Sequence, residues 1–277
     1  MKRLGILLLL GLMGQVLAHG LEFTYNGAAL TGPNTYAGTG YAELSLDNAG
    51  AEGYDLSLMR LSAGKTLADY QEAGAALGRA YAGQGDVVTA HRAIQETVTI
   101  IGGVTVEAGG AGTVGVLLEP GAYVLDGSCE SCGPGQNIRA LTVTEGSRAA
   151  APEPDRRIEF QNYHFSGLPA DLSAGSELWE IANVGQENHM FVVFRLAEGK
   201  TMADLEAFME SPEMQGGPPP AEYGSEALSS AYLTGPVRYY QNVTLEPGNY
   251  VVLCPVMDEA SGKLHTALGM IQTLTVN

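Results

Sequence analysis

The sequence predicts an all-β chain of two tandem β-sandwiches, each with one short inserted helix. Many short stretches alternate apolar with polar residues or are apolar throughout, as strands do when one or both faces are buried. Turns rich in Gly and Pro separate these stretches, which is typical of sandwiches. Blocks of the first half recur in the second half, so both halves should share one fold.

The repeat consists of three blocks that occur in the same order in each half. Residues 48–69 match residues 183–204 at an offset of 135 positions. The motif Leu-Glu-Pro-Gly-x-Tyr-Val occurs at residues 118–124 and again at 245–251, and Leu-Thr-Val occurs at 141–143 and 274–276. Three matches in one order indicate an internal duplication.

The second half shows its elements most clearly. Strands are predicted at residues 158–163, 178–182, 190–196, 237–245, 250–253 and 271–276. A short helix is predicted at residues 202–209, because Thr201 can cap its first turn. Thr66 has the matching position before residues 67–73, so the first half should carry the corresponding helix.

The N-terminus predicts export. Lys2 and Arg3 precede a short apolar core at residues 4–12, and the small residues Val16 and Ala18 fit the positions before a signal-peptidase cleavage site. We therefore expect residues 1–18 to be a signal peptide cut after Ala18, and the mature protein to be periplasmic or secreted. No later segment has the length and apolar character of a membrane helix, so we expect no membrane insertion.

Composition predicts the domain boundary. Residues 146–155 are mostly small or polar and contain two prolines, as linkers do. We expect one domain at residues 19–147, a linker at 148–157 and a second domain at 158–277. The formal net charge of −17 disfavours nucleic acid as a partner, because its phosphates would be repelled.

Ligands suited to a soft metal gather in the second half. His189 begins a predicted buried strand and Cys254 ends another. Cys254 also opens the pattern Cys-x10-His-x4-Met, which continues with His265 and Met270. Two imidazoles, one thiolate and a weak axial thioether stabilise both Cu(I) and Cu(II), so electron transfer needs little rearrangement. Of three cysteines in an exported chain two should pair, and a metal gives the third, Cys254, a role.

These residues resemble the cupredoxins, the plastocyanin–azurin superfamily of type 1 (blue) copper proteins. The stretch Pro-Gly-x-Tyr-x-x-x-Cys at residues 247–254, and Gly-x-x-His at 262–265 with Gly-Met at 269–270, are similar to the approach and exit of the family's ligand loop. The long Cys–His spacing resembles that of copper nitrite reductases and of small secreted bacterial cupredoxin-like proteins. The resemblance covers residues 158–277 directly, and the first half through the repeat. It implies Greek-key sandwiches and one mononuclear copper, with His189, Cys254 and His265 as equatorial ligands and Met270 as axial ligand.

The first half lacks this ligand set. In the repeat, His189 aligns with Tyr54 and Cys254 aligns with Gly127, while Met270 falls near Asn137. The first half should therefore not bind copper in this way.

The first half carries a Cys129-Glu-Ser-Cys132 motif instead. We favour a structural or labile disulfide between Cys129 and Cys132. A redox-active pair and a Cu(I)-binding dithiol are the alternatives, although no βα unit is predicted around the motif as in thioredoxin.

The function predicted from these patterns is electron transfer with a redox partner protein, and not an enzymatic activity. Multicopper oxidases need paired His-x-His motifs and a ligand Cys flanked by His, whereas Leu253 and Pro255 flank Cys254 and the sequence has no His-x-His. Two alternatives are a periplasmic copper carrier or storage protein, whose partner would be a copper donor or acceptor, and a metal-free cupredoxin-like binding module.

Overall fold

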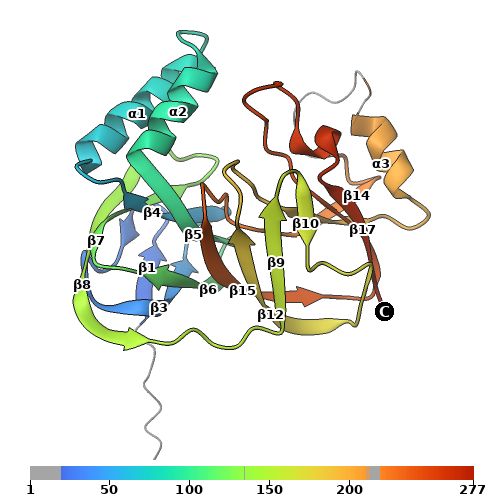
Figure 1. Cartoon of the computed structure of the whole chain (residues 1–277), viewed down its shortest axis with the longest axis horizontal. Coiled ribbons are helices and arrows are strands. Elements are labelled where there is room, and N and C mark those ends of the chain that lie inside the picture. The colour runs from blue at the N-terminus through green and yellow to red at the C-terminus, as the bar shows by residue number, and fades with distance from the viewer. Residues whose placement is uncertain (1–19, 134, 210, 212–218) are drawn as a thin grey trace, which may run out of the picture.

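A computed structural model of the chain describes residues 20–133, 135–209, 211 and 219–277. The predicted signal peptide at residues 1–18 lies outside the described residues. Strands dominate both halves (Figure 1), so the predicted all-β class is confirmed.

The elements follow one another in a similar order in each half. The first half contains β1 (Leu21–Tyr25), β2 (Leu30–Thr31), β3 (Thr35–Asn48), β4 (Tyr54–Leu61), α1 (Leu67–Tyr81), α2 (Val87–Thr97), β5 (Val98–Val106), β6 (Ala111–Leu118), β7 (Gly121–Ser128) and β8 (Asn137–Ala149). The second half contains β9 (Arg156–Gln161), β10 (His164–Ser166), β11 (Asp171–Leu172), β12 (Gly175–Asn183), β13 (Val192–Leu196), α3 (Met202–Met209), β14 (Gly224–Ser229), β15 (Val237–Leu245), β16 (Gly248–Leu253), the 3-10 turn η1 (His265–Leu268) and β17 (Ile271–Val276).

The second half is a sandwich of two layers. One layer has the order β10-β9-β12-β15, and the other has the order β11-β17-β16-β13-β14. Large apolar side chains such as Trp179, Phe191 and Tyr250 are buried between the layers. His189, Cys254 and Met270 lie close to the ends of β13, β16 and β17, three neighbouring strands of the second layer.

In the first half, β3 connects the two layers. It pairs antiparallel with β6 and parallel with β8, and a register shift between Ala37 and Thr39 lies within the β8 pairing. Alternate residues of β3, including Ala42, Leu44 and Leu46, are buried. This alternation is expected of a strand with one face on a core.

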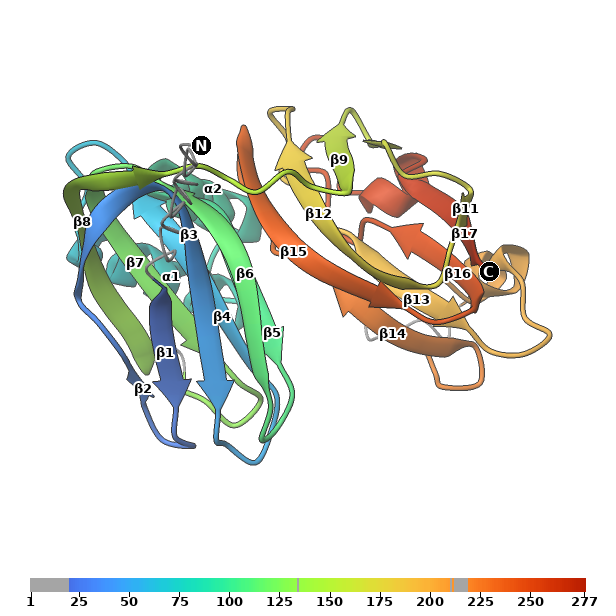
Figure 2. The same cartoon turned by 90° about the horizontal axis from the view of Figure 1, so that it is seen from below.

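The two halves join edge to edge. β15 of the second half pairs antiparallel with β6 of the first half, with Tyr240 opposite Gly115. Figure 2 shows the strands of each half as a separate stack, with β6 and β15 on the sides where the stacks meet. A Cβ at residue 115 would overlap the ring of Tyr41, which packs edge-on against Tyr240 with ring centroids 5.6 Å apart.

Equivalent contacts recur at matched positions in the two halves. The buried side chain of Asn183 donates to the carbonyl oxygen four residues later and accepts the amide two residues later, and buried Asn48 does the same. The Arg195–Glu246 ion pair likewise has a counterpart in the first half, between Arg60 and Glu119. A common origin of the two halves stays a prediction. If the halves arose by duplication, equivalent contacts at matched positions are expected.

The helices differ from the prediction in the first half. One short helix was expected there, but the structure has the 15-residue α1 followed by the 11-residue α2. Gly83, with a φ of 77°, lies in the turn after α1, and the Asp86 side chain accepts the Thr89 amide to start a new helix. The second half contains the predicted α3 and the additional turn η1.

The irregular segment between the halves is shorter than the predicted linker. β8 continues to Ala149 and β9 begins at Arg156, so residues 150–155 connect two strands. The domain boundaries at residues 19–147 and 158–277 stay a prediction. Within the described part of the chain, none of the helices has the length and apolar character that crossing a bilayer requires.

Candidate metal centre

Three of the predicted ligands meet in the second half. The Cys254 sulfur lies 4.0 Å from Nδ1 of His189 and 3.5 Å from Nδ1 of His265, and the two Nδ1 atoms are 3.1 Å apart. All three residues are buried. Among the described residues this is the one such group of His, Cys, Asp or Glu that could hold a metal ion.

The spacing of these donor atoms fits a single metal ion. Bonds of about 2.0 Å to nitrogen and about 2.3 Å to sulfur, arranged trigonally, would separate the nitrogens by about 3.5 Å and each nitrogen from the sulfur by about 3.7 Å. The distances in the structure lie on both sides of these values. Two imidazole nitrogens and one sulfur are the donors of trigonal His₂Cys sites.

His189 is fixed by a turn and by an isolated bridge. Its backbone exchanges two hydrogen bonds with Leu233, at 3.1 and 2.8 Å, just before β13 begins. The Asn183 side chain donates to the Leu233 carbonyl and to the Glu187 carbonyl, which closes the turn that leads to His189. The repeat thus places a conformation-setting Asn six residues before the ligand.

The backbone ties Cys254, His265 and Met270 together. The amide of Cys254 donates to the Met270 carbonyl at 3.0 Å, and the amide of Met270 donates to the His265 carbonyl at 2.9 Å. The chain turns between His265 and Met270 through η1, which ends at Gly269 with a φ of 104°. Met270 is fully buried in the cluster that contains Cys254, and its role as axial ligand stays a prediction.

Asp258 organises the metal loop, which we define as residues 255–264. Its carboxylate accepts the Ser261 amide at 2.7 Å and the hydroxyl of Tyr163 at 2.9 Å. Hydrogen bonds from Ser261 and then from Tyr163 lower the pKa of Asp258 to about 2. The loop that leads from Cys254 to His265 is therefore held by an ionised carboxylate.

Tyr163 covers His265, and no sequence pattern pointed to this contact. Its ring centroid lies 4.8 Å from that of His265. The side chain reaches this place from a two-residue hairpin turn between β9 and β10, where Asn162 and Tyr163 have φ values of 48° and 59°. A left-handed conformation is uncommon for Tyr and costs about 1–2 kcal/mol. No Gly in this turn marked it in advance.

The first half also reaches the metal loop. Gln95 on α2 donates to the Glu259 carboxylate at 2.8 Å, and Arg92 lies 3.8 Å from the same carboxylate. Glu259 follows Asp258 directly, so residues from both halves contact one short stretch of the loop. The repeat gave no signal for this contact, because α2 has no counterpart in the second half.

Burial keeps the ligands uncharged in the absence of a metal. Burial, followed by the nearby His265, lowers the pKa of His189 to about 4, and burial lowers the pKa of His265 as well. Burial raises the pKa of the Cys254 thiol against the hydrogen bonds from the amides of Met190 and Val256. The imidazoles are therefore ready to coordinate at neutral pH, whereas the thiol must release its proton to the solvent when a metal binds.

The matching end of the first half is filled by a tyrosine. Tyr54 is fully buried, and a Cβ added to Gly127 would overlap its hydroxyl. Gly127 pairs with Asn137, and Cys254, with which Gly127 is aligned, donates its amide to the Met270 carbonyl. The structure therefore brings the residues aligned with the ligands to one place, and this place has no His or Cys from those positions.

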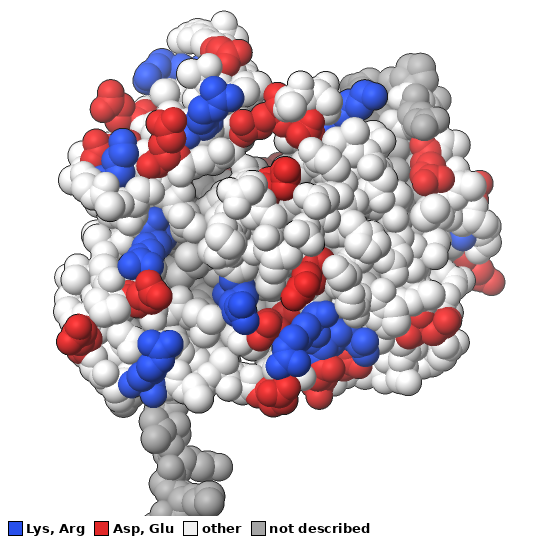
Figure 3. Space-filling model, in the orientation of Figure 1, with Lys and Arg blue, Asp and Glu red and all other residues white. Residues whose placement is uncertain are grey.

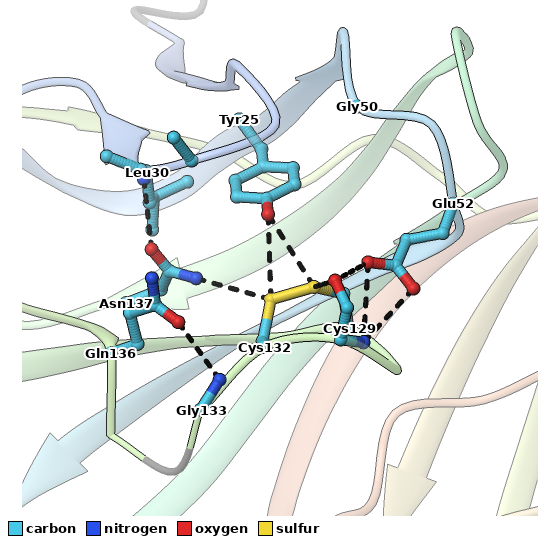
Figure 4. Close-up of a disulfide and its surroundings, with 12 residues drawn as sticks. Tyr25, Leu30, Gly50, Glu52, Cys129, Cys132, Gly133, Gln136 and Asn137 are labelled. Carbon is cyan, nitrogen blue, oxygen red and sulfur yellow. Dashed lines mark hydrogen bonds between the residues drawn. A yellow bond between two sulfur atoms is a disulfide. The ribbon is translucent and has the colours of Figure 1, made fainter.

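The other two cysteines form a disulfide. Cys129 and Cys132 are bonded to each other in the connection between β7 and β8, next to Tyr25 and Asn137 (Figure 4). Cys254 is the free cysteine of the chain.

Comparisons with solved structures return copper proteins at low similarity. The reduced auracyanin of Roseiflexus castenholzii is 21% identical, with 44% of this chain and 94% of that chain covered and a TM-score of 0.30. A multicopper oxidase is 12% identical over 93% of this chain and 88% of that chain, with a TM-score of 0.25. The copper-containing nitrite reductase of Thermus scotoductus SA-01 is 10% identical over 93% of this chain and 61% of that chain, also with a TM-score of 0.25.

Comparisons with protein-family models and with curated protein sequences find no match. No family assignment follows from likenesses of this size. The chemistry of the centre is given by its own donor atoms: two imidazole nitrogens and one thiol sulfur, buried together at the end of a β-sandwich.

Proposed function

We propose that the second half is a cupredoxin-like domain that binds one copper ion in a type 1 site. His189, Cys254 and His265 would be the equatorial ligands and Met270 the weak axial ligand. The observation that carries this proposal is the convergence of two Nδ1 atoms and one sulfur within 4.0 Å of one another, with all three residues buried. The soft sulfur suits Cu(I) and the imidazoles suit Cu(II), so the donor set suits both oxidation states.

We propose electron transfer as the activity of this copper. The ligands are held by β-strand ends, by the backbone bonds among Cys254, His265 and Met270, and by the Asp258-centred loop. A rigid site that changes little between oxidation states favours electron transfer. Copper delivery would instead need a ligand that can be reached from solvent, and His265 is 1% exposed.

The electron would leave or enter through the Tyr163 side of the site. Tyr163 is half-buried and lies against His265, so it is the group between this ligand and solvent. Figure 3 shows an area with few charged side chains in the middle of the face in view, whereas β9 itself carries Arg156, Arg157 and Glu159. Negative charge lies at the exit itself, because the ionised Asp258 accepts the Tyr163 hydroxyl and Glu187 also acts on Tyr163. A redox partner protein that docks here should therefore present basic side chains.

We propose no oxidase or reductase activity for this centre. Of the other described histidines, His91 bonds to the Tyr81 hydroxyl in the helical pair, and His164 is exposed on β10. Neither belongs to the ligand group. We further propose that the chain acts outside the cytoplasm after cleavage at Ala18, where a copper protein meets an oxidising environment.

A titration with Cu(II) tests the copper site. The purified mature protein should take up one equivalent and become intensely blue, because a copper–thiolate bond absorbs visible light strongly. Cys254→Ser should abolish the colour, whereas His164→Gln, a histidine outside the site, should keep it. A colourless wild type, or a blue Cys254→Ser variant, contradicts the proposed site.

Two further measurements separate electron transfer from copper delivery. Ascorbate should bleach the blue protein, and an oxidant should restore the colour over repeated cycles without loss of copper. A Cu(I) chelator should remove the reduced ion slowly, on the timescale of unfolding, because the ligands are buried. Rapid removal of copper from the folded protein would favour the carrier function instead.

A further inference from the structure

The Cys129–Cys132 disulfide lies at the end of the first half that corresponds to the metal end of the second half. It sits in the β7–β8 connection and begins two residues after Gly127, which is aligned with Cys254. Asn137, aligned near Met270, lies beside it (Figure 4). Sulfur chemistry therefore occupies this end of both halves, as a bonded pair in one and as a free thiol in the other.

The disulfide is surrounded by hydrogen-bond donors. The hydroxyl of Tyr25 lies 3.6 Å from each of the two sulfurs, and the Asn137 side-chain amide donates to the Cys132 sulfur at 3.5 Å (Figure 4). Both cysteines are half-buried, in contrast to the fully buried Cys254.

The Tyr25 hydroxyl suits a reduced sulfur better than an oxidised one. Tyr25 is 4% exposed, and among the described residues its hydroxyl has no oxygen or nitrogen partner. A buried hydroxyl normally finds such a partner. A disulfide sulfur is a weak acceptor, whereas a thiolate accepts a charge-assisted hydrogen bond that is about twice as strong as a neutral one.

Hydrogen bonds besides the disulfide also hold this loop. The Cys132 amide donates to the Cys129 carbonyl at 3.1 Å, and the Gly133 amide donates to the Gln136 side chain at 2.9 Å. Ser131 is held by the Glu52 carboxylate through its amide and its hydroxyl. Reduction would thus leave the two sulfurs close together and able to form the bond again.

We propose that Cys129 and Cys132 form a dithiol–disulfide redox site that exchanges two electrons and two protons with a partner dithiol. A thiolate of the partner attacks the Cys129 sulfur, the Cys129–Cys132 bond breaks, and Cys132 leaves as a thiolate that accepts hydrogen bonds from Tyr25 and Asn137. The second partner thiolate then attacks the partner's own sulfur in the mixed disulfide. This step releases Cys129, and the partner leaves as a disulfide. Protons from the two partner thiols complete the two thiols of this chain.

This redox site is independent of copper, so it is tested on the copper-free protein. The protein is equilibrated with mixtures of reduced and oxidised dithiothreitol, and the free thiols are trapped with an alkylating reagent and counted by mass. The wild type should add two labels while circular dichroism stays native. Buried Cys254 should stay unlabelled, which reports that the second half remains folded.

Tyr25→Phe isolates the proposed donor, because it keeps the ring that stacks on Tyr54 at 3.9 Å. The equilibrium constant for reduction should fall about tenfold, which corresponds to about 30 mV. Tyr41→Phe, a tyrosine packed on Tyr240 at the junction, should leave the constant unchanged. In Cys132→Ser, the remaining Cys129 thiolate should attack the disulfide dimer of a dithiol probe that has one thiol blocked. One half of the dimer should leave as a thiol, and the other half should stay on Cys129 as a mixed disulfide, because no second thiol can resolve it.

Three results would overturn the proposal. The first is reduction that occurs only together with loss of the native circular dichroism, which would make the bond a structural cross-link. The second is an equal reduction constant in wild type and Tyr25→Phe. The third is a Cys132→Ser variant whose remaining Cys129 thiol does not react with the oxidised probe while the protein is folded.

Discussion

The copper-free protein should lose stability in mild acid because of His189. Its side chain is fully buried and its pKa is lowered to about 4, first by burial and then by His265. The unfolded chain has a histidine pKa of about 6.5, so between about pH 6.5 and pH 4 the unfolded state binds a proton that the folded state does not. The free energy of unfolding therefore falls as the pH falls through this window. At about 1.4 kcal/mol for each pKa unit, the full loss is about 3 kcal/mol.

Urea unfolding of the copper-free protein at a series of pH values between 4 and 7.5 measures this loss. Carboxylates also titrate in this range, so the difference between wild type and His189→Phe isolates the histidine. The variant should show a flatter pH profile, whatever its absolute stability. His164→Gln, which removes an exposed histidine, should keep the slope of the wild type. Parallel profiles for wild type and His189→Phe would refute the reasoning.

Three further substitutions test how the two ends are built. Asn183→Ala should lower the free energy of unfolding by about 2–3 kcal/mol in urea, because it leaves buried backbone groups without partners; a change below 0.5 kcal/mol would contradict this. Gly127→Ala should cost at least about 2 kcal/mol, since its Cβ overlaps the Tyr54 hydroxyl. Adding Tyr54→Phe should recover only part of that loss, because Cζ and Cε1 of the ring also lie only 2.5 and 2.8 Å from the added Cβ. Tyr163→Phe keeps the ring but loses the hydrogen bond to Asp258. Exchange of the backbone amides in the metal loop should quicken about fivefold, which corresponds to about 1 kcal/mol. Unchanged exchange would count against the role of that bond.

The repeat and the ligand spacing predicted most of the architecture of the centre. The Pro-Gly turn and the repeated motif located β16, and the repeated Leu-Thr-Val located β17. The Cys-x10-His-x4-Met pattern placed Cys254 directly after β16, Met270 directly before β17 and His265 between them. These features are local motifs, which a single sequence displays directly. Cys254 and His189 meet because each follows or precedes a strand of the same layer.

The contacts around the predicted ligands could not be predicted from the sequence. Tyr163 reaches His265 through a left-handed Asn-Tyr turn, and without a Gly such a turn has no clear sequence signal. Gln95 reaches Glu259 because α2 extends one half toward the other, a tertiary contact between residues 164 positions apart. β14 lies where no strand was predicted, and it forms as an edge strand because β13 offers it backbone partners.

The pairing of β6 with β15 covers one sheet edge of each half. Each of these strands would be an outer strand of its own half, with a row of unpaired amides and carbonyls open to any other extended chain. Joined, they shield each other from aggregation by strand addition. A half expressed alone would expose this edge strand to solvent and should be less soluble than the whole chain.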